Sequence, residues 1–408
     1  MILIFRLAFL NLFRHRMRTF LNVLMVGCAF LFMVCFHGFA SAMLGNLMKS
    51  STESLHGHFQ VANRSQWDQL PVDIPKDRYL TNEKEIIQRL KQNPWVTSIT
   101  PRNQFYGLIS FEQSTIAAVV QAYDPKVEKS LMENYAIKEG VSFPGKDKYE
   151  LMLGKGLQKR LQAKVGETLN IVTQTADGST NAISATLVGI FALGIAEVDD
   201  NTAYLNLAAS ERLLDIDEHQ TLVVTLKDLN VLDEQLKEIR NKFHDFPDLI
   251  FKSWYDLATM YRQVQAFFAV QDTMVEFIFA LLIFFGLMNT IGASIFERTG
   301  EIGTLRAIGD TESDVLKIFL CEIFFQALVG LLIFLPLTLV VIQIVNAVSF
   351  PITMPLATEP LPLRLEPQWH HFLRSGFIVL IAALIAGWIP ARRGSKTSIV
   401  EALRKNIN

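Results

Sequence analysis

The chain has 408 residues, of which 50% are hydrophobic and only 19% are charged, and its mean hydropathy is positive. This composition is typical of several membrane spans combined with one sizeable soluble part. The formal net charge is −2, and the soluble part carries both signs, so nucleic-acid binding is not suggested. Three cysteines lie in or beside apolar runs, which excludes a disulfide framework and a zinc site: Cys28, Cys35 and Cys321.

The N-terminal residues 1–19 mix large apolar side chains with arginines, which predicts a cytoplasmic helix at the membrane interface. Its interfacial cations are Arg14, Arg16 and Arg18. The first predicted span covers residues 20–44, and residues 21–44 contain no Asp, Glu, Lys or Arg. A secretory signal peptide is the alternative, but the apolar run is longer than such a peptide needs, and further apolar segments follow.

Three more apolar segments are long enough to cross a bilayer. They cover residues 274–296, 318–348 and 372–389. Pro336 predicts a kink in the third span, and Arg374 near the start of the fourth can reach the headgroups.

The distribution of Lys and Arg predicts the orientation. Residues 1–19 hold four of them, residues 297–317 three and the 390–408 tail five, whereas the 349–371 loop holds one. Both termini and residues 297–317 are therefore expected in the cytoplasm, which places residues 45–270 outside.

The outside region is long enough for a domain with its own core and has a mixed α+β pattern. Residues 57–140 and 219–253 are expected to form a helix-and-strand part, and residues 145–215 a mostly β insertion. Asn82 and Glu85 predict a capping box at the start of a helix.

Residues 254–273 are expected to form a helical stalk continuous with the second span. Apolar side chains recur along one side of this stalk and give it a packing seam: Leu257, Tyr261, Val264 and Phe268.

The sequence offers no recognisable chemistry of its own. Lys155 between two glycines lacks the spacing and the hydroxyl residue of a phosphate-binding loop. His56 and His58, and Asp199 and Asp200, form no known catalytic arrangement. We therefore expect no enzyme activity, no metal site and no cofactor in this chain.

Residues 297–317 form a charged island between two spans, so they are expected at a membrane surface. Ile302, Leu305 and Ile308 recur at helical spacing, which predicts an amphipathic helix that Gly309 and Asp310 end.

This island resembles the cytoplasmic coupling helix of the type VII ABC permeases, the MacB, FtsX and LolC/LolE superfamily, whose motif is E-R-x-x-E-I-G-x-L-R-A-x-G. The matching residues are Glu297, Arg298, Glu301, Ile302, Gly303, Leu305, Arg306, Ala307 and Gly309. The C-terminal PARRGSKTSIVEALRKN is similar to a second family motif.

The resemblance implies a fold of four transmembrane helices with a large α+β periplasmic domain between helices 1 and 2. Residues 57–140 and 219–253 would be its Porter-like subdomain, and residues 145–215 its Sabre-like subdomain. The layout looks most like LolC and LolE.

The resemblance also implies a mechanotransmitting permease of the bacterial inner membrane. Two ABC ATPase subunits would bind ATP and magnesium, a second permease, identical or homologous, would complete the complex, and a periplasmic carrier or adaptor would assist. Release of lipoproteins or lipids is the expected function. The alternatives are efflux of a peptide, toxin or drug, and FtsX-like signalling to a cell-wall hydrolase.

Glu322 lies just inside the third apolar run, where a charge is costly. It can link the coupling helix to this span, or it can be an interfacial residue that pairs with Lys317. The sequence leaves both readings open.

Overall fold

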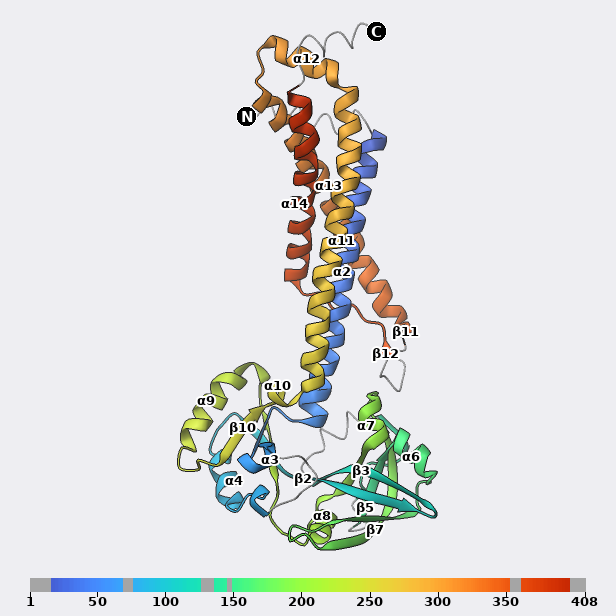
Figure 1. The fold of residues 1–408 in the computed structure, drawn as a ribbon, viewed down its shortest axis with the longest axis vertical. Helices are drawn as coiled ribbons and strands as arrows, with labels where there is room; N and C mark the ends of the chain where they lie inside the picture. Colours follow the sequence, from blue (N-terminus) through green and yellow to red (C-terminus); the bar gives the residue numbers. More distant parts are fainter. Residues whose placement is uncertain (1–15, 69–75, 126–135, 145–148, 353–360, 397–408) are drawn as a thin grey trace. The chain divides into compact units, whose positions relative to one another are not determined.

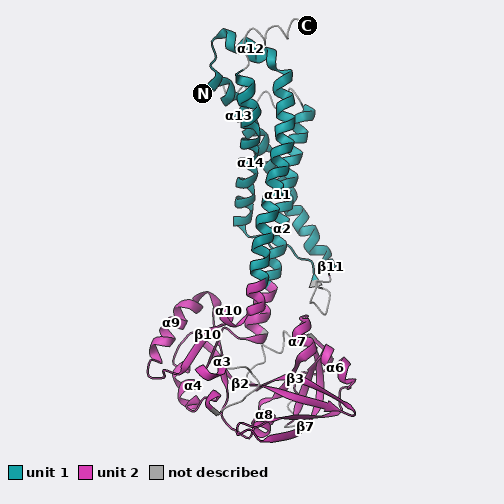
Figure 2. Ribbon diagram, in the orientation of Figure 1, with its two compact units in different colours: residues 1–45, 264–351, 362–408 teal, residues 46–263, 352–361 magenta. Residues whose placement is uncertain are grey.

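The computed structural model describes residues 16–68, 76–125, 136–144, 149–352 and 361–396. Most of the expected N-terminal interfacial helix, including Arg14, and the tail beyond residue 396 lie outside the described residues. The described chain divides into two units, coloured separately in Figure 2. Unit 1 contains residues 1–45, 264–351 and 362–408, and unit 2 contains residues 46–263 and 352–361.

Unit 1 is a bundle of long apolar helices (Figure 1). Four helices in the described part of the chain are long and apolar enough to cross a membrane: α2 (Arg16–Lys49), α11 (Thr259–Glu297), α13 (Glu312–Val348) and α14 (Trp369–Ser395). The short helix α12 (Thr299–Ile308) follows α11. Each predicted span falls within one of these helices.

The bundle is held together by close helix packing around an apolar core. A Cβ atom on Gly27 of α2 would lie 2.0 Å from the ring of Phe334 on α13, so only glycine permits this contact. Small residues at helix contacts let backbones approach in lipid, where apolar attraction alone associates helices poorly.

Unit 2 is an α+β domain in which ten described strands form one sheet, while β11 (Pro351–Ile352) and β12 (Leu361–Pro362), at its border with unit 1, pair separately. The sheet order is β10-β1-β9-β2-β3-β8-β5-β7-β4, and β6 pairs with β2 and β7. The strands are β1 (Phe59–Asn63), β2 (Val96–Phe111), β3 (Ser114–Tyr123), β4 (Ala136–Gly140), β5 (Glu150–Gly154), β6 (Thr168–Gln174), β7 (Thr180–Ala192), β8 (Thr202–Asn206), β9 (Thr221–Leu226) and β10 (Leu249–Ser253).

Helices cover the sheet around two main cores (Figure 1). One core joins β1, β9 and β10 to α4 (Glu83–Lys91), α9 (Leu232–Lys242) and α10 (Trp254–Leu257). The other core joins the strands β3, β5 and β8 to the helices α6 (Lys155–Leu161) and α8 (Leu207–Leu214). Two short helices complete the list of described α-helices: α3 (Arg64–Asp68) and α7 (Ala196–Asn201).

The subdomain boundary differs from the sequence-based division. Phe105 on β2 and Val120 on β3 were assigned to the part formed by residues 57–140, yet both pack into the core built from residues 151–214. The reason is that β2 is long: its first half pairs with β9 and its second half with β6, so one strand serves both cores.

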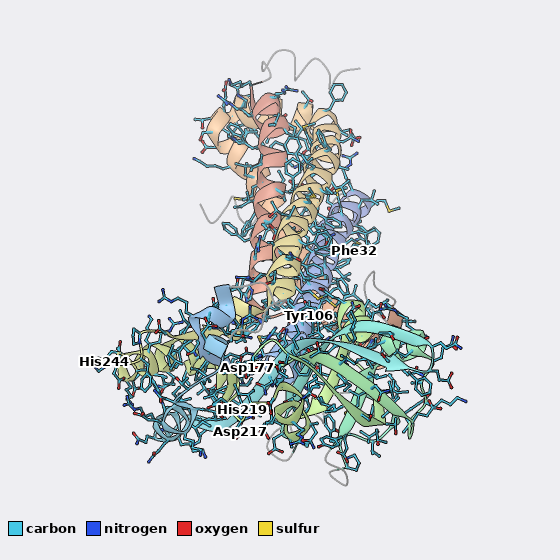
Figure 3. All side chains as sticks on the ribbon, turned by 60° about the horizontal axis from the view of Figure 1, so that its bottom comes forward. Phe32, Tyr106, Asp177, Asp217, His219 and His244 are labelled. Atoms are coloured by element: carbon cyan, nitrogen blue, oxygen red, sulfur yellow. The ribbon has the colours of Figure 1, made fainter. Side chains whose placement is uncertain are left out.

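His219 joins the two parts of unit 2 and is labelled in Figure 3. Its Nδ1 lies 2.8 Å from Oε2 of Glu83, at the start of α4, and its Nε2 lies 3.1 Å from Oε1 of Glu211 in α8. Burial alone would lower the pKa of His219, but the hydrogen bonds and charges of the two glutamates outweigh it and raise the pKa. A protonated His219 therefore ties α4 to α8.

The expected stalk helix is interrupted near its start. α10 ends at Leu257, Ala258 leaves the helical conformation with ψ 69°, and α11 then runs unbroken from Thr259 to Glu297. The prediction of one helix from residue 254 is therefore wrong. Ser253 and Asp256 form a capping box that starts the short helix α10, and the non-helical Ala258 ends it before α11 begins.

The predicted stalk residues consequently fall on two helices. Leu257 belongs to α10, and Tyr261 packs edge-on against Trp254 at 5.0 Å between ring centroids. Val264 is half-buried, and Phe268 is buried against Phe39 of α2, with ring centroids 6.0 Å apart. Phe268 is thus a contact between α11 and the first apolar helix.

Candidate coupling site

The predicted coupling residues lie on α12 and directly beside it: Glu297 is the last residue of α11, Arg298 precedes α12, and Gly309 follows it. α12 ends because Gly309 adopts φ +119°, a left-handed conformation that glycine takes at little cost. Thr311 then starts α13: its hydroxyl oxygen accepts a hydrogen bond from the backbone N–H of Asp314 at 3.2 Å. α12 is therefore a separate helix between α11 and α13.

Arg298 anchors the start of α12 to α13. Its Nη1 donates to Oε2 of Glu322 at 3.0 Å, and its Nε donates to Oε2 of Glu301 at 3.1 Å. The guanidinium also lies 5.4 Å from the ring centroid of Phe319. The side chains of Arg298 and Glu322 are only 9% and 11% exposed, so this is a buried ion pair.

Burial alone would lower the pKa of Arg298, but the charge and hydrogen bond of Glu322, reinforced by Glu301, raise it. The sequence left two possible partners for Glu322, the coupling segment and Lys317. In the structure Glu322 pairs with Arg298, directly before α12. Lys317 instead pairs with Asp314, at 3.2 Å. Glu322, predicted at the membrane interface, is therefore tied to the residue that leads into α12.

A second group of polar contacts connects the helices next to this pair. Asn22 of α2 donates to Gln326 of α13 at 2.8 Å and accepts from Thr290 of α11 at 2.7 Å. Arg18 pairs with Glu297 at 2.8 Å. These contacts bring α2, α11 and α13 together beside α12, around a small cavity that Asn22, Glu322 and Gln326 help to line. The Arg298–Glu322 pair therefore lies next to a junction of three helices.

The other predicted coupling residues divide between two faces of α12. Ile302 and Gly303 are buried against the bundle, Glu301, Leu305 and Arg306 are half-buried, and Glu297, Ala307 and Gly309 are exposed. Arg306 donates to the carbonyl oxygen of Ser395 at 3.2 Å, which links α12 to the end of α14.

Ile308 is the main departure from the sequence interpretation. The periodicity placed it on the buried stripe with Ile302 and Leu305, but it is 81% exposed. Ile308 is the last residue of α12, directly before Gly309, and its side chain does not pack against the bundle. Ile308 is thus the large apolar residue of α12 that is most open to a partner, although a single exposed apolar side chain does not by itself mark an interface.

No metal-binding group of three or more His, Cys, Asp or Glu side chains occurs among the residues that the structure describes. Lys155, which lies between two glycines, is the first residue of α6, and Gly156 next to it lies against Asp200. A phosphate there would meet a carboxylate, which is unfavourable. Arg16, predicted as an interfacial cation, is exposed at the start of α2.

Two family models match the chain. The MacB-like periplasmic core domain matches residues 19–242, which is more than half of the chain. The FtsX-like permease C-terminal model matches residues 273–399 and so includes α12.

Individual relatives agree with these models. An uncharacterized ABC transporter permease of Methanocaldococcus jannaschii is 26% identical over 66% of this chain and 66% of its own length. The lipoprotein-releasing system transmembrane protein LolE of Haemophilus influenzae is 24% identical over 78% of this chain and 79% of its own. The macrolide export ATP-binding/permease protein MacB of Pectobacterium atrosepticum is 22% identical over 98% of this chain and 60% of its own.

Proposed function

Because the chain belongs to the ABC-transporter permeases of the MacB, FtsX and LolE type, we propose that it couples ATP hydrolysis by a separate ATPase to movement of unit 2. In this proposal two ATPase subunits bind ATP and magnesium in the cytoplasm. A second permease, identical or homologous, completes the complex in the bacterial inner membrane.

The observation that carries this proposal is the two-sided character of α12. One face is fixed to the bundle by the buried Arg298–Glu322 pair, and the helix ends on the exposed Ile308. An element that is attached to the bundle on one side and exposes an apolar residue at its end can contact a partner and pass the movement of that partner to the bundle. α11 then carries the movement, because it is one uninterrupted helix of 39 residues, or about 58 Å at ~1.5 Å per residue.

For the substrate we propose lipoproteins or lipids taken from the inner membrane. The support is the relative LolE, a lipoprotein-releasing protein that aligns with 78% of this chain. Efflux of a peptide, toxin or drug is the alternative favoured by the alignment of a macrolide exporter with 98% of the chain. Transmembrane signalling to a cell-wall hydrolase is a third candidate, which rests only on the resemblance of residues 273–399 to FtsX-like permeases. Proteins that copurify with the intact complex distinguish them: a periplasmic carrier, an adaptor or a hydrolase.

Glu301→Ala tests the coupling assignment. The Glu301 side chain is 38% exposed, so loss of its contact with Arg298 should cost less than ~1 kcal/mol of stability. We nevertheless expect a several-fold fall in stimulation of the ATPase, measured with both proteins in lipid nanodiscs. The matched control is Glu238→Ala, which removes an exposed ion pair with Lys242 in α9. Equal ATPase stimulation in the two variants would contradict the assignment.

The proposed orientation predicts which residues a membrane-impermeant thiol reagent reaches. In a variant without the three native cysteines, a cysteine at Asp177 should be labelled in intact cells, because it is exposed in the turn between β6 and β7 (Figure 3). A cysteine at Asp310, which is exposed between α12 and α13, should be labelled only after the membrane is opened. The reverse pattern would place unit 2 in the cytoplasm and exclude the proposed direction of coupling.

A further inference from the structure

A cluster of ionisable side chains lies inside unit 1, far along α11 from the coupling site. At its centre is His37 of α2, whose side chain is 0% exposed. Nδ1 of His37 lies 3.0 Å from Oδ1 of Asp272, and Nε2 lies 3.3 Å from Oε1 of Glu276, both on α11. Asp272 and Glu276 are one helical turn apart, so they present their carboxylates to the same side. A histidine in an apolar helix is thus enclosed by two acidic groups.

Each ring nitrogen of His37 faces a carboxylate oxygen. A carboxylate can only accept hydrogen bonds, so the contact with Asp272 places a proton on Nδ1. Nε2 is buried and has no hydrogen-bond partner of good geometry, while an oxygen of Glu276 lies 3.3 Å away. If Nε2 carried no proton, its lone pair would face the negatively charged oxygen of Glu276 in a buried site, which is unfavourable. If Nε2 is protonated, the positive charge of the imidazolium faces the negative charge of Glu276.

The remaining charged groups balance one imidazolium and not two. Arg374 of α14 forms a bidentate ion pair with Glu276, with Nε 2.8 Å from Oε1 and Nη2 2.9 Å from Oε2. With His37 protonated, two cations meet two carboxylates.

The ring of His371 stacks on that of His37, with centroids 5.2 Å apart and planes 15° apart. Nδ1 of His371 accepts the backbone N–H of Gln368 at 3.1 Å, so that nitrogen carries no proton and His371 is neutral. Two further ionisable residues belong to the segments packed here: His370, whose ring centroid is 4.0 Å from that of His371, and Glu366, whose backbone N–H donates to the carbonyl of Gly38.

We propose that His37 is a proton-binding site that ties α2 to α11. Binding of the proton completes a four-charge cluster across three helices, and its release leaves Asp272 and Glu276 facing a neutral ring. The contact between α2 and α11 then weakens at this level, between the stacked pair Phe32 and Phe279 and the pair Phe39 and Phe268. Phe32 is labelled on α2 in Figure 3. Acidic conditions therefore hold these two helices together. This goes beyond the proposed coupling to an ATPase and does not depend on it.

The protonation state can be read directly from imidazole nitrogen resonances. The full chain, with ¹⁵N-labelled histidine, is placed in lipid nanodiscs and titrated from pH 5.5 to 9. His37→Gln identifies the His37 signals by their absence, and His370→Gln is the matched control on a neighbouring exposed ring. We expect two protonated nitrogens on His37 at pH 5.5 and loss of one proton at higher pH. A His37 ring that is neutral throughout the range would overturn the proposal.

A second variant and a distance measurement test the tie between the helices. Asp272→Asn, which keeps the histidine, should reduce the share of His37 rings that carry two protons at pH 5.5, and an unchanged share would contradict the role of the carboxylate. Spin labels at the half-buried Cys35 of α2 and at the exposed Met274 of α11, in a variant without Cys28 and Cys321, should give a narrow distance distribution at pH 5.5 and a broader one at pH 9. The His37→Gln protein should be broad at both pH values. A distribution that does not change with pH in the unmodified sequence would show that the proton does not hold the helices together.

Discussion

Replacing Ala266 and Phe267 with proline should uncouple the permease while leaving ATP hydrolysis by its partner intact. Both side chains are exposed, so the substitutions remove little packing. Each proline removes a backbone hydrogen bond of α11 and clashes with the preceding turn, at a cost of about 3 kcal/mol or more. A helix kinked at this point cannot carry a displacement along its axis.

The position of these prolines follows from the structure. Because α11 begins at Thr259, prolines at residues 262 and 263 would fall close to its first turn, where proline is tolerated best. The matched control replaces Ala266 and Phe267 with glutamine, a good helix former. We expect the control to keep substrate release and the proline variant to lose it, in proteoliposomes that contain the whole complex. Full activity of a correctly inserted proline variant would contradict transmission through α11.

The second large effect is expected at the buried ion pair. Glu322→Ala leaves Arg298 buried without its main counter-charge, which should cost about 3–5 kcal/mol of stability. We expect a marked fall in the thermal unfolding midpoint in detergent. The milder Glu322→Gln keeps an acceptor for the guanidinium and should lose less.

A double variant separates stability from coupling. Replacing Arg298 with Met and Glu322 with Leu removes both charges, and such apolar replacements of buried pairs are often neutral or stabilising. This variant should fold well but stimulate the ATPase poorly, because α12 is no longer fixed to α13. If it retains full stimulation, the ion pair stabilises the bundle and is not the coupling link.

The sequence predicted the elements that have a strong local signal. The apolar runs lie within α2, α11, α13 and α14, and the turn at Asp177 and Gly178 connects the antiparallel pair β6 and β7. Asn82 illustrates the limit of local rules: α4 begins at Glu83 as the motif predicts, yet the Asn82 side chain makes no capping hydrogen bond. His219 instead holds the start of that helix through Glu83, a contact between residues 136 positions apart.

Features that depend on tertiary packing could not be read from the pattern. The exposure of Ile308 depends on how α12 turns against the bundle, and periodicity alone placed it on the wrong face. His37 was also missed, but a signal existed. Glu276 lies inside the second predicted span and Arg374 inside the fourth, and opposite charges in two spans are expected to pair. Such a pair predicts that these helices are neighbours and points to the ionisable residues beside it.

The central claim is that α12 docks on a separate ATPase, and site-specific photo-crosslinking tests it most directly. A photoreactive amino acid is placed at Ile308, which is 81% exposed, and at Tyr106 as an exposed control on β2 in unit 2. The protein is crosslinked in intact cells, and the crosslinked partners are identified by mass spectrometry. We expect the residue at position 308 to capture an ATP-binding-cassette protein and the one at position 106 not to capture it. Capture of that ATPase from position 106 and not from position 308 would contradict the account.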